Sequence, residues 1–138
     1  FEKSIYQVES KATPVFKRYE ETFKKFGLGQ ATIYDTYSVA RQAKDVCDQI
    51  QYSIYKLDVP KGLPKEVTSL LNTTKENISY AYTLKAESFN AAMAFMDEQK
   101  PGKADEFERK RDEADKYMML GALALLDAKS KVGIKIVE

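Results

Sequence analysis

Apolar residues recur at intervals of three and four along four long stretches of the chain, and this spacing marks one face of an α-helix. The four stretches cover residues 1–26, about 30–57, 64–99 and about 103–132. Glycine and proline, which end helices, stand between the stretches in three short segments: Gly27-Leu28-Gly29, residues 58–64 and Lys100-Pro101-Gly102. The pattern therefore predicts an all-α protein with four helices of comparable length.

Short connections leave few arrangements for these helices. They make consecutive helices antiparallel neighbours, so we expect an antiparallel up-down-up-down four-helix bundle. A chain of 138 residues fits one domain and shows no internal repeat. We therefore interpret residues 1–138 as a single helical-bundle domain, with the apolar residues 134–137 packed back onto the bundle.

The apolar spacing of the first stretch continues through Pro14 without a change of phase. A proline inside a helix removes one backbone hydrogen bond and kinks or breaks the helix. Thr13 and Pro14 would also suit the start of a new helix, as its N-cap and first residue. Because the phase is kept, we predict one first helix that is kinked at Pro14, with two separate helices as the alternative.

The longest uncharged and mostly apolar run is residues 117–126, in the fourth stretch. A helix that is apolar all round is normally covered on all sides. We therefore expect this run to be the middle of a central helix. A membrane-spanning helix needs about 20 apolar residues. This run has about ten and is flanked by Lys116 and Asp127, so we predict no transmembrane segment.

The balance of charged residues excludes several classes of function. Lys and Arg total 22 against 21 Asp and Glu, which provides no basic surface for nucleic acid. The chain has no histidine, so it lacks the ligands of His-containing metal sites and the base of His-dependent triads. The single cysteine, Cys47, lies on an apolar stripe and is interpreted as a buried core residue. We therefore predict that the protein is not an enzyme and holds no metal or cofactor.

Lys85 falls on the apolar stripe of the third helix, where a charge is unexpected. Counted away from the turns, it is level with Tyr117 and near Tyr37 and Tyr19. Ligand sites in bundles are built from side chains on facing helices. These four residues are therefore candidates for an interior site that binds a small molecule or a lipid. In the alternative reading, Lys85 extends its ammonium into solvent and the tyrosines place only their hydroxyls at the rim.

Four further tyrosines exceed what the core needs, and tyrosine is enriched at protein interfaces. They are the candidate partner surface: Tyr34, Tyr52, Tyr55 and Tyr80. We therefore predict a non-enzymatic interaction module with an unidentified protein partner. The interior site near Lys85 is the alternative function, and the surplus of aromatic residues is compatible with a homo-oligomer.

The start at Phe1, the near absence of cysteine and the many lysines resemble small helical-bundle domains that bacteria export, often with a lipid anchor upstream. These features favour the soluble part of an exported protein or lipoprotein. We therefore expect an extracellular or cell-surface location, with a cytoplasmic location as the alternative.

Overall fold

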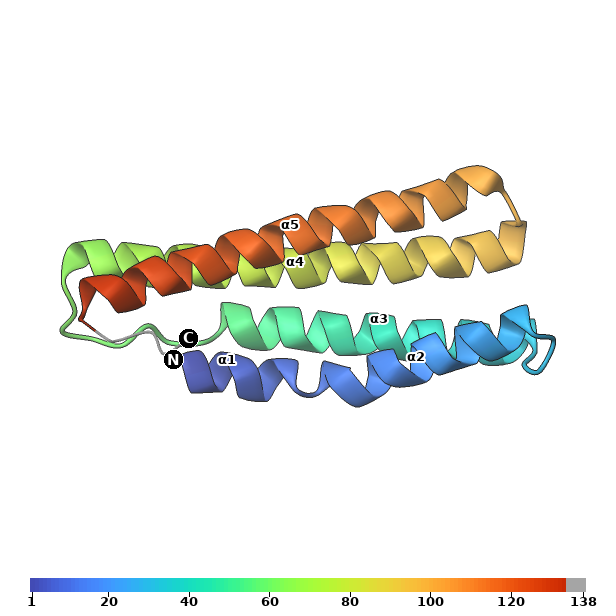
Figure 1. Ribbon diagram of the computed structural model, residues 1–138, viewed down its shortest axis with the longest axis horizontal. Coiled ribbons are helices and arrows are strands. Elements are labelled where there is room, and N and C mark those ends of the chain that lie inside the picture. The colour runs from blue at the N-terminus through green and yellow to red at the C-terminus, as the bar shows by residue number, and fades with distance from the viewer. Residues whose placement is uncertain (134–138) are drawn as a thin grey trace.

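The computed structural model describes residues 1–133, of which 84% are helical and none is in a strand. The expected packing of residues 134–137 lies outside the described residues. The helices are α1 (Glu2–Glu9), α2 (Ala12–Gly27), α3 (Ile33–Tyr55), α4 (Lys65–Glu98) and α5 (Pro101–Lys131), as Figure 1 shows. They match the four predicted stretches, the first of which is divided into α1 and α2.

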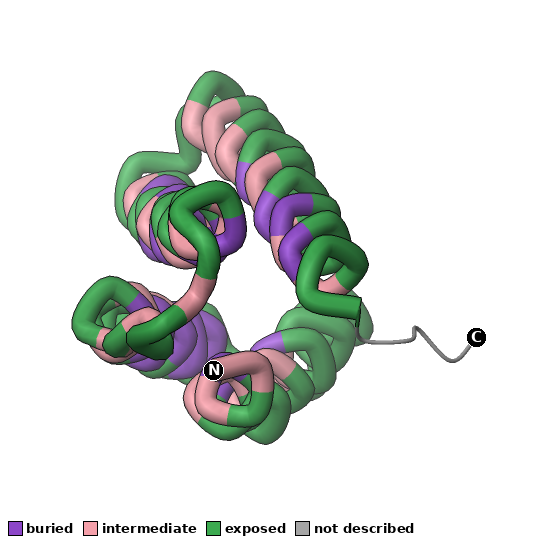
Figure 2. The backbone as a smooth tube through the Cα atoms, turned by 90° about the vertical axis from the view of Figure 1, so that its left-hand side faces the viewer, coloured by how far each residue is buried: buried purple, intermediate pink, exposed green. Residues whose placement is uncertain are grey.

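The helices form the predicted antiparallel bundle, with α1 and α2 together acting as one bent helix. Both α1 and α2 pack against α3, α3 packs against α4, and α4 packs against α5 along its length. The contact of α4 with α5 is more extensive than its contact with any other helix. In Figure 2 the buried positions lie on the sides of the helices that face one another, and the exposed positions form the outer surface.

The first helix is kinked, as predicted, and its two parts are bent by 34°. The break falls at Ser10 and Lys11, immediately before α2 and four residues ahead of Pro14. Pro14 has no N–H to donate to the carbonyl of Ser10, and its ring crowds that carbonyl. At the break, the Lys11 N–H donates to the carbonyl of Val8, three residues earlier, at 3.3 Å. The bend therefore lies at the hydrogen-bond acceptor that the proline cannot use.

The start of α3 and the end of α4 are fixed by local chemistry. The Thr32 hydroxyl accepts a bond from the Asp35 N–H and the Asp35 carboxylate accepts one from the Thr32 N–H, both at 3.1 Å. This reciprocal capping box satisfies two N–H groups that a helix start leaves free. At the other end of the bundle, Gln99 adopts a left-handed conformation with φ of 53°, and Pro101 opens α5. A left-handed residue stops a helix, so α4 and α5 are joined by a tight connection.

The expectation that residues 117–126 form a central helix is wrong, because α4 holds that position. Helix α4 lies between α3 and α5 and is buried along most of its length. Helix α5 buries only four small residues, namely Ala114, Gly121, Ala124 and Ala128. Small side chains let two backbones approach closely, so this row forms the contact with α4. Met118 and Leu125 of the run are partly buried against the core, whereas its other large apolar side chains, Met119, Leu120, Leu123 and Leu126, are exposed.

Candidate functional site

Lys85 is partly buried, and its charge is accommodated by aromatic rings. Its Nζ lies 4.8 Å from the centre of the Tyr82 ring and 5.4 Å from the centre of the Phe16 ring. An ammonium over the face of an aromatic ring is attracted by the electron density of the ring. These contacts give Lys85 a structural reason to lie on the apolar stripe of α4.

Tyr19 is the one predicted ligand residue that shares this aromatic cluster. Its ring packs edge-on against Phe89 at 4.9 Å, and Phe16 packs against the same ring at 5.7 Å. Burial raises the pKa of the Tyr19 hydroxyl, and the nearby positive charge of Arg111 partly opposes this rise. Tyr19 is therefore a neutral core residue at ordinary pH.

The structure places Tyr37 and Tyr117 away from Lys85. Gln51 of α3 donates to Ser79 of α4 at 3.2 Å, and from this level the antiparallel helices bring Tyr37 about two turns beyond Lys85. Tyr117 packs edge-on against Tyr80 at 4.6 Å, more than one turn from Lys85 on the other side. The expected register is thus wrong by one to two turns, and the four residues do not surround a common point. Their role in ligand binding stays a prediction.

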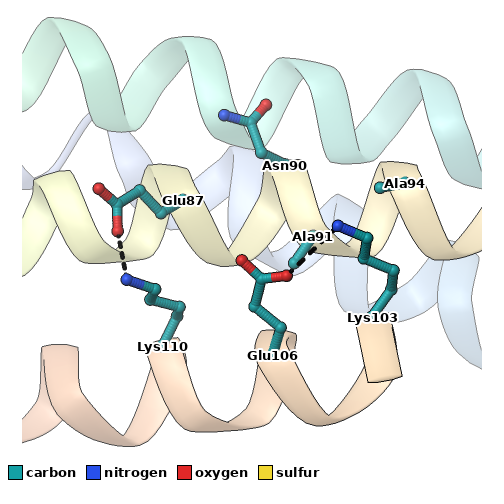
Figure 3. A pocket seen from close by; sticks show the side chains of 7 residues that line it. All are labelled: Glu87, Asn90, Ala91, Ala94, Lys103, Glu106 and Lys110. Carbon is teal, nitrogen blue, oxygen red and sulfur yellow. Dashed lines mark ion pairs between the residues drawn. The ribbon is translucent and has the colours of Figure 1, made fainter. Parts of the chain in front are cut away.

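A charged groove runs between α4 and α5 near the tight connection (Figure 3). It has a volume of about 390 Å³. Lys110 pairs with Glu87 at 2.9 Å, and Lys103 pairs with Glu106 at 3.6 Å. The hydrogen bond to Glu87 also raises the pKa of the Lys110 ammonium. Because the charges are paired with one another, the groove offers no free charge to a ligand.

An apolar groove of about 390 Å³ lies at the opposite end of the bundle, where α1, α4 and α5 meet. Much of its wall belongs to a small core cluster around Val67, Leu71 and Ala128. At its rim, Lys129 pairs with Glu2 at 2.9 Å, which neutralises both charges. The groove is therefore the exposed side of a packed core rather than a site with a polar group aimed into it.

The structure separates one of the four tyrosines of the predicted partner surface from the others on its helix. Tyr34 is 84% exposed in the first turn of α3, whereas Tyr52 and Tyr55 are exposed in its last turn, roughly 27 Å away. Tyr80 lies on α4 against Tyr117, and its neighbour Ser79 bonds to Gln51, the neighbour of Tyr52. Tyr34 therefore does not share a patch with Tyr52 and Tyr55, and the role of the four tyrosines in partner binding stays a prediction.

The largest contiguous set of exposed apolar side chains on one helix belongs instead to α5. Met119 is 65% exposed, Leu120 41%, Leu123 54% and Leu126 43%. Steps of three and four residues bring them to the side of α5 that does not pack against α4. We call these four residues the α5 face. Apolar side chains scattered singly over a surface are normal in a folded protein, whereas these four lie together.

The sequence contained a signal for this surface, which the length of the apolar run concealed. Gly121, Ala124 and Ala128 are separated by three and four residues, so they form a narrow row of small side chains on one side of a helix. Met119, Leu120, Leu123 and Leu126 are out of phase with that row. A helix that makes its close contact through the small residues turns these four side chains outward.

The described part of the chain offers neither a metal site nor a membrane span. Residues 1–133 contain no group of His, Cys, Asp or Glu that could hold a metal ion. None of the helices α1–α5 is both long enough and apolar enough to cross a membrane. Comparison of the chain with protein-family models, with curated proteins and with solved structures finds no match.

Proposed function

We propose that this protein is a non-enzymatic interaction module that binds an amphipathic helix of a protein partner through the α5 face. The observation that carries the proposal is the exposure of Met119, Leu120, Leu123 and Leu126 on one side of a helix whose other side is packed. An export signal and a lipid anchor stay predictions of the sequence.

The size of the face indicates a reversible interaction. Full burial of a Leu or Met side chain gains about 1.5–3 kcal/mol, so covering four half-exposed side chains gains about 3–6 kcal/mol. Association costs at least about 4 kcal/mol in lost freedom of motion. The apolar face alone therefore gives weak binding, and polar contacts at its edges must supply the rest.

The shape and charge of the surroundings favour a helix as the partner. Apolar side chains spaced by three and four residues form a narrow stripe, which fits the apolar stripe of another helix. Acidic and basic residues are mixed around the stripe, among them Asp115, Lys116 and Asp127. An anionic membrane or a nucleic acid would require a consistently basic border.

Site-specific crosslinking in the cells that make the protein tests the proposal. The photoreactive residue p-benzoylphenylalanine is placed at position 123 on the α5 face, and at positions 34 and 52 as matched controls on α3. We expect a discrete crosslinked product from position 123 that disappears in the Leu120→Asp variant. Products from positions 34 or 52 alone would overturn the α5 face as the binding surface and favour the tyrosines of α3.

A further inference from the structure

Two charged residues extend the apolar stripe of α5 in a specific pattern. Lys116, Leu120, Leu123 and Asp127 are separated by four, three and four residues, and all four are exposed. This is the spacing of the a and d positions, which form the contact in a coiled-coil heptad. Leu120 and Asp127 occupy one of these two positions, and Lys116 and Leu123 occupy the other. The stripe therefore has two leucines at its centre, a positive charge at one end and a negative charge at the other.

We propose that the partner of the α5 face is a second copy of this chain, whose α5 lies antiparallel to the first. The inference rests on the proposed function, because it uses the same face. The two-fold axis crosses α5 between Gly121 and Ala122, since both the leucine pair and the charged pair are centred there. Leu120 then packs against Leu123 of the other copy, and Lys116 faces Asp127 of the other copy. The two-fold axis repeats each contact with the two copies exchanged.

The charges select this orientation. In a parallel pair of α5 helices, each Lys116 would face the other Lys116 and each Asp127 the other Asp127, which is repulsive at both ends. In the antiparallel pair, every charge on the stripe meets its opposite. A helix of another protein would have to carry the complementary pattern, whereas the chain supplies that pattern to itself.

The ion pairs near the stripe are consistent with this arrangement. Neither Lys116 nor Asp127 belongs to an ion pair among residues 1–133, although Lys110, Lys129 and Lys131 do. Asp127 lies near Lys131 and helps to raise the pKa of that ammonium, but Lys131 forms its ion pair with Glu66, so Lys116 and Asp127 can both pair across an interface. The contact is smaller than the ~800 Å² per partner of a standard interface, so it is a weak dimer that forms at micromolar or higher concentrations.

Charge reversal measured by sedimentation equilibrium tests the proposal. The full chain is studied from about 1 to 500 µM at low salt, because salt screens exposed charges. Lys116→Glu removes two attractions and creates two repulsions, so we expect the dissociation constant of the dimer to rise about tenfold. Asp127→Lys should have the same effect, and the double variant Lys116→Glu/Asp127→Lys should restore the dissociation constant to within about threefold. Lys61→Glu is the matched control, since it makes the same charge change in the connection between α3 and α4.

The outcomes separate this inference from the proposed function. Restoration in the double variant supports the antiparallel pair, because an unrelated partner would not be rescued by a swap within this chain. A dimer that Leu123→Asp abolishes, but that does not respond to charge reversal, overturns the antiparallel register and leaves the α5 face in place. A wild-type chain that stays monomeric at every concentration overturns self-association, while a crosslink from position 123 to a different protein still supports the proposed function.

Discussion

The contact between α4 and α5 is so close at Gly121 that adding one methyl group should destabilise the protein. A Cβ at position 121 would lie 2.6 Å from Cγ1 of Ile78 and 3.4 Å from the backbone nitrogen of Ile78. Cγ1 is in the middle of its side chain, and Ile78 is only 4% exposed. Neither the backbone nor the side chain of Ile78 can therefore move away without disturbing the core.

The magnitude follows from two opposing effects of Gly121→Ala. Alanine favours a helix interior over glycine by about 1 kcal/mol, whereas an extra carbon in a packed core costs about 1–3 kcal/mol. We expect a net loss of about 1 kcal/mol in the free energy of unfolding. Ile78→Ala removes Cγ1 and costs about 2–5 kcal/mol by itself. In that background Gly121→Ala should stabilise by about 1 kcal/mol, which gives a coupling of about 2 kcal/mol between the two positions.

Urea unfolding followed by far-ultraviolet circular dichroism measures all four proteins of this cycle. Gly102→Ala is the control, because Gly102 lies in the first turn of α5 and a Cβ there would have no neighbour within 4 Å. It should stabilise the protein by a few tenths to about 1 kcal/mol. If Gly121→Ala stabilises the wild-type chain as much as Gly102→Ala does, α5 does not approach α4 closely and the packing argument is wrong.

Predictions at three further positions follow from the structure. Cys47 has no exposed surface and burial raises the pKa of its thiol from 9.0 to about 12, so iodoacetamide should alkylate it only after unfolding. Because the thiol ionises at lower pH in the unfolded chain, its contribution to stability is complete below pH 9.0 and is lost as the pH rises towards 12. The difference in free energy of unfolding between wild type and Cys47→Ala should therefore fall by up to about 1.4 kcal/mol per pH unit in that window. A constant difference would contradict this. The Tyr82 hydroxyl donates to Glu9 at 3.0 Å, so Tyr82→Phe should cost about 1 kcal/mol and speed amide exchange in α1, whereas unchanged exchange would show that this bond does not hold α1 in place. Thr32→Ala removes the capping box of α3 and should cost about 1 kcal/mol in urea unfolding, and a loss confined to a few tenths would mean that the cap is replaced by water.

The helices were predictable because their signals are local. Spacings of three and four residues define each stretch, and glycine or proline marks each connection. The kink was predictable from Pro14 for the same reason, since a proline affects a hydrogen bond only one turn away. The bend lies at Ser10 and Lys11 because the missing bond belongs to the acceptor rather than to the proline itself.

The register between helices was not predictable from the positions of the turns. The connection between α3 and α4 contains nine residues outside both helices, whereas only Gln99 and Lys100 separate α4 from α5. Counting residues away from each connection treats the two connections as alike. The levels expected in this way for Tyr37 and Tyr117 differ from their levels in the structure by one to two helical turns relative to Lys85. The expectation that Tyr37 and Tyr117 lie level with Lys85 depended on that count, and it is wrong for this reason.

The same row of small residues explains both why α5 is stable and why it has a free apolar face. A helix can either surround itself with neighbours through large side chains or approach one neighbour closely through small ones, and α5 does the second through Gly121, Ala124 and Ala128. Its close fit to α4 leaves Leu120 and Leu123 on a side that α4 cannot reach. We therefore expect the two sides to be separable by substitution. A methyl group at position 121 should act on folding, whereas a charge at position 123, on a side chain already 54% exposed, should leave the bundle intact and weaken the association that we propose.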